Sequence, residues 1–384
     1  MLVLINFLVG GMVGLERTIL PLIAERDFGL ESYAAAISFI ATFGITKALI
    51  NLFAGSISEY WGRKKILVWG WVCGLPIPII LIYAQDWSWI LFANVLLGIN
   101  QAFAWSMTVV MKVDLVHERR RGLAIGLNEF AGYFGLALTA YLTAQIADEQ
   151  GLRPYPFYLG FALAAAGLII SMLTRDTQPG ASPKSNSKAA VFPLKRVFKM
   201  TTVTVPELSS ASVSGLVTNL KDGMFWGLLP IFLTGQGLEI GQVGIVVAVY
   251  PIFWSVVQLV SGPASDKLGR KWIIASGMLV QGLGIAGFIF LNSYEAYIFA
   301  AIITGVGTAM VYPTLLALVS DHSDQNWRAS ALGVYRFWRD LGYAVGALGA
   351  GILADVVGIR HTMLVAAMLT VIAAIDIIFR VRKS

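Results

Sequence analysis

Few charged residues, three histidines and one cysteine distinguish this sequence. Only 13% of its 384 residues are Asp, Glu, Lys or Arg and 57% are hydrophobic, whereas soluble domains are about 25% charged and about 45–50% apolar. So few charges cannot cover the surface of a soluble fold of this size. Intrinsic disorder is excluded as well, because the apolar content is high and the net charge of +6 is small. We therefore expect an integral membrane protein.

Further absences exclude other classes of protein. The single cysteine, Cys73, cannot build a disulfide framework or a cysteine-based zinc site. The sequence shows no nucleophile–base pair, no phosphate-binding loop and no cluster of metal ligands, so we expect neither an enzyme nor a bound cofactor or metal. The basic residues form no polar block, so no nucleic-acid partner is expected.

Long apolar runs are abundant. A helix needs about 20 apolar residues to cross the hydrocarbon core of a bilayer, and twelve stretches reach that length. They are too long for barrel strands and lack a two-residue alternation. Connections between them are mostly short, so successive helices are expected to be antiparallel neighbours. The predicted spans are residues 2–24, 33–58, 66–84, 88–112, 122–144, 154–173, 209–234, 241–262, 272–291, 295–319, 329–354 and 360–379.

The distribution of Lys and Arg predicts the orientation of these helices. With the N-terminus inside, most of the 28 basic residues fall in cytoplasmic segments, and only Arg26, Arg153 and Arg360 fall outside. Cytoplasmic loops of membrane proteins carry this excess of positive charge. We expect a multi-pass protein of the bacterial inner (plasma) membrane, with both termini in the cytoplasm.

One long connection divides the chain. Its first part, residues 178–187, is rich in Pro, Gly and Ser, as flexible linkers are. Residues 191–200 alternate basic and apolar side chains, which is typical of a helix lying at the membrane interface. We expect an N-terminal six-helix bundle over residues 1–173, a cytoplasmic linker with an interfacial helix over 174–206, and a C-terminal six-helix bundle over 207–384.

The two halves repeat each other. Residues 55–64 read G-S-I-S-E-Y-W-G-R-K, and residues 262–271, 207 positions later, read G-P-A-S-D-K-L-G-R-K. The same offset relates Gly135 to Gly342. Both copies lie between equivalent helices with the same orientation, so the halves are parallel repeats. The shared motif consists of Gly55, Glu59, Gly62, Arg63 and Lys64 in the first copy and of Gly262, Asp266, Gly269, Arg270 and Lys271 in the second.

This doubled motif resembles the G-x-x-x-D-x-x-G-R-K signature of the major facilitator superfamily. The second copy fits it fully, and the first has Glu59 where Asp is usual. The resemblance covers the chain in helix number, repeat and linker. It implies an all-α membrane protein with twelve transmembrane helices in two parallel six-helix repeats. It also implies that the motif residues form a cytoplasmic gate that stabilises the outward-open state.

A small group of charged residues lies inside the predicted helices, where ionisable groups must be paired, hydrated or functional. Counting about 1.5 Å per helical residue places this group in one central slab of the membrane. The residues expected to bind substrate or couple transport are Glu16, Arg17, Lys47, Glu129, Lys221, Asp222, Arg336, Arg339 and Asp340. The residues expected to line a cavity beside them are Asn100, Gln101, Trp105, Tyr250, Tyr312 and Tyr335. By the resemblance, Lys47 and Asp340 lie on facing helices, so they are candidates for an ion pair as well as for substrate contacts.

These residues predict a secondary active transporter that moves a small molecule by alternating access. Proton coupling is expected because Glu16, Glu129, Asp222 and Asp340 can titrate in a cavity of low dielectric constant. Five basic groups face these four acids, which favours a substrate with an anionic group. The alternatives are an exporter of cationic or lipophilic compounds, a lipid or amphiphile flippase, and a non-transporting sensor. The Gly-Pro motif of drug–proton antiporters is absent from residues 132–137. We expect the protein to be monomeric in the bilayer.

Overall fold

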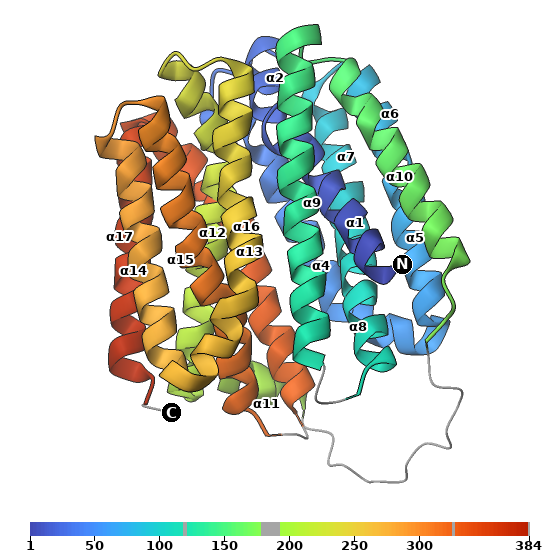
Figure 1. Cartoon of the computed structure of the whole chain (residues 1–384), viewed down its shortest axis with the longest axis vertical. Helices are drawn as coiled ribbons and strands as arrows, with labels where there is room; N and C mark the ends of the chain where they lie inside the picture. The colour runs from blue at the N-terminus through green and yellow to red at the C-terminus, as the bar shows by residue number, and fades with distance from the viewer. Residues whose placement is uncertain (118–120, 178–192, 325–326, 383–384) are drawn as a thin grey trace.

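The chain folds into a bundle of long helices. The computed structural model describes residues 1–117, 121–177, 193–324 and 327–382, and within these ranges the chain is helical and has no strand. Figure 1 shows the helices standing side by side, with α11 (Leu194–Lys199) at one end and α2 (Leu20–Arg26) at the other. We refer to these as the α11 end and the α2 end.

Twelve helical units make up the bundle in the described part of the chain. The first six are α1 (Leu2–Arg17) with α2, α4 (Ser38–Trp61), α5 (Arg63–Gly74) with α6 (Pro76–Tyr83), α7 (Trp87–Asn100) with η1 (Gln101–Trp105) and α8 (Ser106–Leu115), α9 (Arg121–Gln150), and α10 (Tyr155–Leu173). The second six are α12 (Pro206–Gly235), α13 (Ile240–Leu268), α14 (Arg270–Phe290), α15 (Tyr294–Asp321), α16 (Arg328–Val357) and α17 (Ile359–Arg380). The short elements are α3 (Tyr33–Ala36), α11 and η3 (Met200–Thr204).

These units match the predicted spans to within a few residues at most of their ends. Ten of them are long and apolar enough to cross a membrane. The other two, α4 and α12, have 24 and 30 residues and are therefore long enough as well. In α12 the run of apolar residues is interrupted by Lys221 and Asp222 at its centre.

Interruptions in two of the units position candidate side chains. α1 ends at Arg17, and the chain turns before α2, whose second residue is Pro21. Proline cannot donate the backbone hydrogen bond of a helix interior, so a break here is expected. Between α7 and α8 the chain forms the π-helix η1, which contains Gln101 and Trp105. Such π-segments re-aim side chains and often occur at functional sites.

Within each half, glycines allow two helices to pack at very short range. A Cβ atom at Gly10 of α1 would lie 1.8 Å from the carbonyl oxygen of Gly132 in α9. In the second half, a Cβ at Gly346 of α16 would lie 2.1 Å from the carbonyl oxygen of Leu220 in α12. Only glycine permits this approach, as in other helix pairs in membranes. The first and fifth units of each half therefore make the same kind of contact.

The helix α11 and the two ends of the chain lie at different heights along the bundle. Part of the predicted interfacial segment forms α11, in which Val197 is buried against the second half while Leu194 and Phe198 are exposed. The expected flexible segment, residues 178–187, lies outside the described residues. Residue 1 lies about halfway along the bundle, whereas α17 ends at the α11 end (Figure 1). That both termini lie in the cytoplasm stays a prediction.

Candidate functional site

A narrow central cavity lies between the two halves. Its volume is about 30 Å³, which is enough for ordered water but not for an organic molecule. Units from the first half (α4, η1, α8, α9) and from the second (α15, α16) surround it. It is lined by Lys47, Asn51, Gln101, Trp105, Ser106, Val109, Ile125, Glu129, Tyr133, Tyr312, Leu316, Arg336 and Arg339.

The charged residues of the lining are three cations and one carboxylate. The carboxylate is Glu129, which accepts hydrogen bonds from Trp105 Nε1 at 2.9 Å and from Asn128 Nδ2 at 3.4 Å. Lys47, Glu129 and Arg336 keep part of their surface exposed. These three side chains therefore border free space, although the cavity is too small in this state for an organic molecule.

One of the three cations is neutralised. Arg339 donates from Nη2 and Nε to Asp340 Oδ1, at 2.7 and 2.9 Å. The other oxygen of this fully buried carboxylate accepts a hydrogen bond of 2.8 Å from Asn51 Nδ2. Asn51 in turn accepts one from Ser106 Oγ at 3.0 Å. This chain of contacts links α16 of the second half to α4 and α8 of the first.

The other two cations, Lys47 and Arg336, pair with no carboxylate among the described residues. Lys47 and Asp340, candidates for an ion pair, do not form one: Asp340 pairs with Arg339, whose Nε and Nη2 both donate to Oδ1. Lys47 Nζ instead lies 5.5–5.7 Å from the ring centroids of Phe43, Trp105 and Tyr343. Cation–π contacts of this kind hold an ammonium group without neutralising it.

Two pairs of cavity residues occupy equivalent positions in the repeat. The offset of 207 residues relates Trp105 to Tyr312 and Glu129 to Arg336, and all four line the cavity. The two halves therefore place opposite charges at matching positions of one cavity. The repeated sequence motif does not include these positions, but its offset could have identified them.

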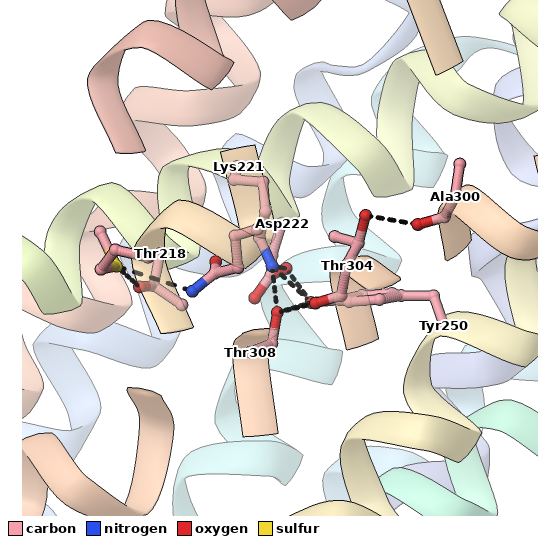
Figure 2. Close-up of polar contacts among 9 residues, drawn as sticks. Thr218, Lys221, Asp222, Tyr250, Ala300, Thr304 and Thr308 are labelled. Carbon is pink, nitrogen blue, oxygen red and sulfur yellow. Dashed lines mark hydrogen bonds and ion pairs between the residues drawn. The ribbon is translucent and has the colours of Figure 1, made fainter. Parts of the chain in front are cut away.

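A second charged group is enclosed within the second half, away from the cavity lining. Figure 2 shows Lys221 and Asp222 of α12 meeting Tyr250 of α13 and Thr308 of α15. Lys221 Nζ lies 2.8 Å from Asp222 Oδ1 and donates to Tyr250 Oη and Thr308 Oγ1, at 2.6 and 2.7 Å. Tyr250 Oη also donates to Asp222 Oδ1 at 2.5 Å. Lys221 and Asp222 are fully buried, so this pair holds α12, α13 and α15 together.

A third charged pair, Glu16 and Arg17, lies toward the α2 end. Both side chains are fully buried, and neither the carboxylate of Glu16 nor the guanidinium of Arg17 has a hydrogen-bond partner among the described residues. The Arg17 guanidinium lies over the rings of Trp226 and Phe43, at 4.8 and 4.9 Å. Trp226 also stacks on Tyr343, with ring centroids 5.0 Å apart. This aromatic layer of Phe43, Trp226 and Tyr343 separates Arg17 from the cavity.

Contacts between the halves close the α2 end. Asp355 of α16 accepts hydrogen bonds from Ser32 Oγ at 2.7 Å and from the backbone N–H groups of Tyr33 and Ala34 at 2.6 and 3.2 Å. A carboxylate of one half therefore caps the first turn of α3 in the other half. Sequence reasoning missed Asp355 because its partners lie more than 300 residues away.

The remaining predicted cavity residues occupy different places. Gln101 lines the cavity and donates from Nε2 to the Val9 carbonyl at 2.8 Å. Asn100 instead donates to the Gly70 carbonyl at 2.9 Å and holds η1 against α5. Tyr250 belongs to the enclosed Lys221 group, and Tyr335 is buried against Gly215 of α12. Tyr133 and Asn51 line the cavity and were not predicted.

The two copies of the gate motif form turns of the same shape. Gly62 and Gly269 have φ values of +90° and +88°, a region that side-chain-bearing residues rarely adopt. Arg63 pairs with Asp114, and Arg270 pairs with Asp266 and Asp321. These ion pairs join elements of the same half. The side chain of Glu59 lies outside the described residues.

Comparisons with known proteins agree with this architecture. The family model of the Major Facilitator Superfamily matches residues 2–221 and again residues 211–384. The chain is 23% identical to a probable 4-methylmuconolactone transporter of Cupriavidus pinatubonensis, over 84% of this chain and 79% of that protein. It is 22% identical to the multidrug resistance protein MdtG of Citrobacter koseri, over 96% and 91%. The crystal structure of the human organic anion transporter MFSD10 superposes with a TM-score of 0.73 at 15% identity, over 98% of each chain.

The expected family and fold are thereby confirmed. The two matches of the family model together cover essentially the whole chain. The chain belongs to the Major Facilitator Superfamily and is a multi-pass membrane transporter, not an enzyme.

Proposed function

We propose that the protein is a proton-coupled secondary transporter of small organic anions that works by alternating access. The observation that carries this proposal is that Lys47 and Arg336 line the central cavity from opposite halves without a carboxylate partner among the described residues. A charge held at this depth in a membrane protein costs several kcal/mol unless it is compensated. A substrate carboxylate would supply the missing negative charge.

The rest of the lining favours a compact substrate with an apolar or ring-shaped body. Trp105, Tyr133 and Tyr312 present aromatic surface to the cavity. Small-molecule sites commonly combine such surface with a few placed polar groups. Arg336 suits the planar, bidentate geometry of a carboxylate. One structural neighbour is described as an organic anion transporter and one relative as a probable 4-methylmuconolactone transporter, which agrees with this substrate class.

Glu129 is the carboxylate that we assign to proton coupling. It lines the cavity directly, whereas Asp340 is neutralised by Arg339 and Asp222 by Lys221. An anion and a proton that enter the same low-dielectric cavity offset each other's charge, so their binding is expected to be cooperative. Substrate and proton would then cross together.

Alternating access is supported by the contacts that join the halves on the α2 side of the cavity. The aromatic layer of Phe43, Trp226 and Tyr343 is buried on the α2 side of the cavity, and Asp355 holds the halves together beyond it. Typical ligand pockets enclose about 300–1,000 Å³, so the cavity of about 30 Å³ must widen to hold a substrate. We propose that the halves separate at the α11 end to admit it and rock apart at the α2 end to release it.

The test is uptake of labelled benzoate and short aliphatic carboxylates into proteoliposomes with an imposed pH gradient. We expect accumulation by the wild-type protein and a loss of roughly tenfold or more for Arg336→Gln, because a charge-assisted hydrogen bond contributes about 1.5–3 kcal/mol. Glu129→Gln is expected to keep anion exchange at equal pH and to lose accumulation driven by the gradient. Lys199→Gln, at the exposed end of α11, is the matched control and is expected to behave as wild type.

Parallel assays address the alternatives. Tetraphenylphosphonium tests cation export, and a labelled lysophospholipid tests flipping of amphiphiles. Transport of the cation or the amphiphile without anion uptake, unchanged by Arg336→Gln, would overturn the proposal. A thermal shift by an anion without any flux would indicate a sensor instead.

We further propose that the protein is a monomer in the bacterial inner membrane, with the α11 end and both termini in the cytoplasm. Its two halves, residues 1–173 and 207–384, are joined by the linker 174–206. The basic residues of α11 support this orientation. A C-terminal green fluorescent protein fusion is expected to fluoresce, as only a cytoplasmic fusion does, and a dark, full-length fusion would contradict the orientation.

A further inference from the structure

An apolar groove opens on the outside of the first half, between the end of α4 and the start of α5. Its volume is about 660 Å³. Tyr60 is 90% exposed and Trp69 is 52% exposed, so the groove faces the surroundings of the bundle rather than the central cavity. It is lined by Ile57, Tyr60, Trp61, Ile66, Trp69, Cys73 and Phe103.

The aromatic walls of this groove are absent from the equivalent place in the second half. The offset of 207 residues carries Trp61 to Leu268, Trp69 to Ser276 and Phe103 to Met310. The second half builds the same hairpin, between α13 and α14, without these rings. Folding of the repeat therefore does not require them, and their presence in one half calls for a local explanation.

A basic residue of α5, Lys65, directly precedes Ile66, which lines the groove. Lys65 is exposed and has no ion-pair or hydrogen-bond partner among the described residues. It precedes Trp69 and Cys73 by four and eight residues on the same face of α5. It lies at the α11 end, one turn from the Gly62 turn where the membrane-spanning part of the hairpin ends. The position equivalent to Lys65 in the second half is occupied by Trp272.

We propose that this groove binds one anionic phospholipid from the leaflet at the α11 end. One acyl chain lies between α4 and α5 against Trp61, Trp69 and Phe103, and the phosphate contacts Lys65. The groove has the apolar walls that an acyl chain requires, and it has a cation at the level where a lipid head group lies. This lipid site is separate from the transport cavity, and it holds whether or not the transported substrate is an anion.

Native mass spectrometry of protein released from vesicles of equal phosphatidylcholine and phosphatidylglycerol tests this site. The wild-type protein is expected to retain one phosphatidylglycerol in preference to phosphatidylcholine. Lys65→Gln is expected to reduce that preference about fivefold, the effect of one basic residue near a membrane surface. Lys267→Gln, an exposed lysine at the equivalent end of the second half, is the matched control and is expected to leave the preference unchanged.

A second variant separates the acyl-chain contact from the head-group contact. Trp69→Ser installs the residue of the second half and is expected to lower retention of both lipids by a similar factor. Because Lys65 is exposed, Lys65→Gln decides the question even if Trp69→Ser does not fold. The proposal is overturned if Lys65→Gln retains the two lipids as wild type does. It is equally overturned if the groove is covered by a second copy of the chain, seen as a dimer mass or as a cross-link through Cys73.

Discussion

At the scale of single residues, the choice of partner for Asp340 decides the charge of the cavity. The fork of Arg339 and the amide of Asn51 satisfy both oxygens of this carboxylate, and Lys47 is left among aromatic rings. Arg339 places two charge-assisted donors on one oxygen of this buried carboxylate, and Asn51 satisfies the other. The positive charges of Lys47 and Arg336 therefore remain available to a ligand.

The Lys221–Asp222 pair gives a prediction about stability. Lys221→Met leaves Asp222 as an uncompensated charge in a fully enclosed position, which is expected to lower the free energy of unfolding by about 3–5 kcal/mol. The double variant Lys221→Met/Asp222→Leu removes both charges and is expected to lose less than the single variant. Unfolding in detergent, followed by tryptophan fluorescence, measures both effects.

Lys267→Met, at an exposed position of α13, serves as the control for loss of a lysine and is expected to leave the unfolding free energy nearly unchanged. If the double variant loses as much stability as Lys221→Met or more, the charges do not compensate each other and the electrostatic account of this group is wrong.

At the scale of helices, short irregular elements place the side chains that join the halves. The π-helix η1 turns Gln101 and Trp105 toward the cavity, whereas Asn100, one residue earlier, faces α5. The one-turn helix α3 presents its free N–H groups to Asp355 of the opposite half. A helix terminus and a carboxylate form a contact that can be broken without disrupting either half, which is what a gate requires.

Asp355→Ala is therefore expected to open the α2 end. Loss of a helix cap costs about 0.5–2 kcal/mol, which corresponds to a roughly two- to thirtyfold change in the equilibrium between closed and open states. Ile37 is fully buried beside Gly227 of the opposite half, so a cysteine there reports the opening. We expect Asp355→Ala to raise the maleimide labelling rate of Ile37→Cys by this factor, in a Cys73→Ser background.

Asp27→Asn provides the matched control, because Asp27 also forms an ion pair at the α2 end but with Arg153 of the same half. Its loss is expected to leave the labelling rate at the value of the parent. Equal labelling of the Asp355→Ala protein and its parent would show that the cap does not hold the halves closed.

At the scale of the whole molecule, the sequence predicted the spans, the repeat and the family, because apolar length and a fixed offset are properties of the chain itself. It also predicted that charges such as Lys47 and Arg336 lie at one depth, because depth follows from counting residues along a helix. It could not predict that Asp340 pairs with Arg339, or that Lys221 is enclosed within one half. Those outcomes depend on side-chain directions and helix rotations that only the packed bundle defines.

The repeat leads to a prediction about the molecule as a pair of related halves. Glu129 and Arg336 occupy equivalent positions and line one cavity. Arg336→Glu alone places two acids in the lining and is expected to lower anion transport roughly a hundredfold, through loss of a charge-assisted hydrogen bond and added repulsion. In Glu129→Arg/Arg336→Glu the charges exchange places.

The exchanged cavity keeps the same net charge, so uptake of benzoate is expected to recover to within about tenfold of wild type, the scale on which coupled charge pairs restore one another. Glu129→Arg alone controls for the added bulk of arginine. A double variant as inactive as Arg336→Glu would mean that Glu129 and Arg336 have separate roles that cannot be exchanged between the halves. Recovery would mean that transport depends on the charges that the two halves present together, and that both halves contribute to one substrate site.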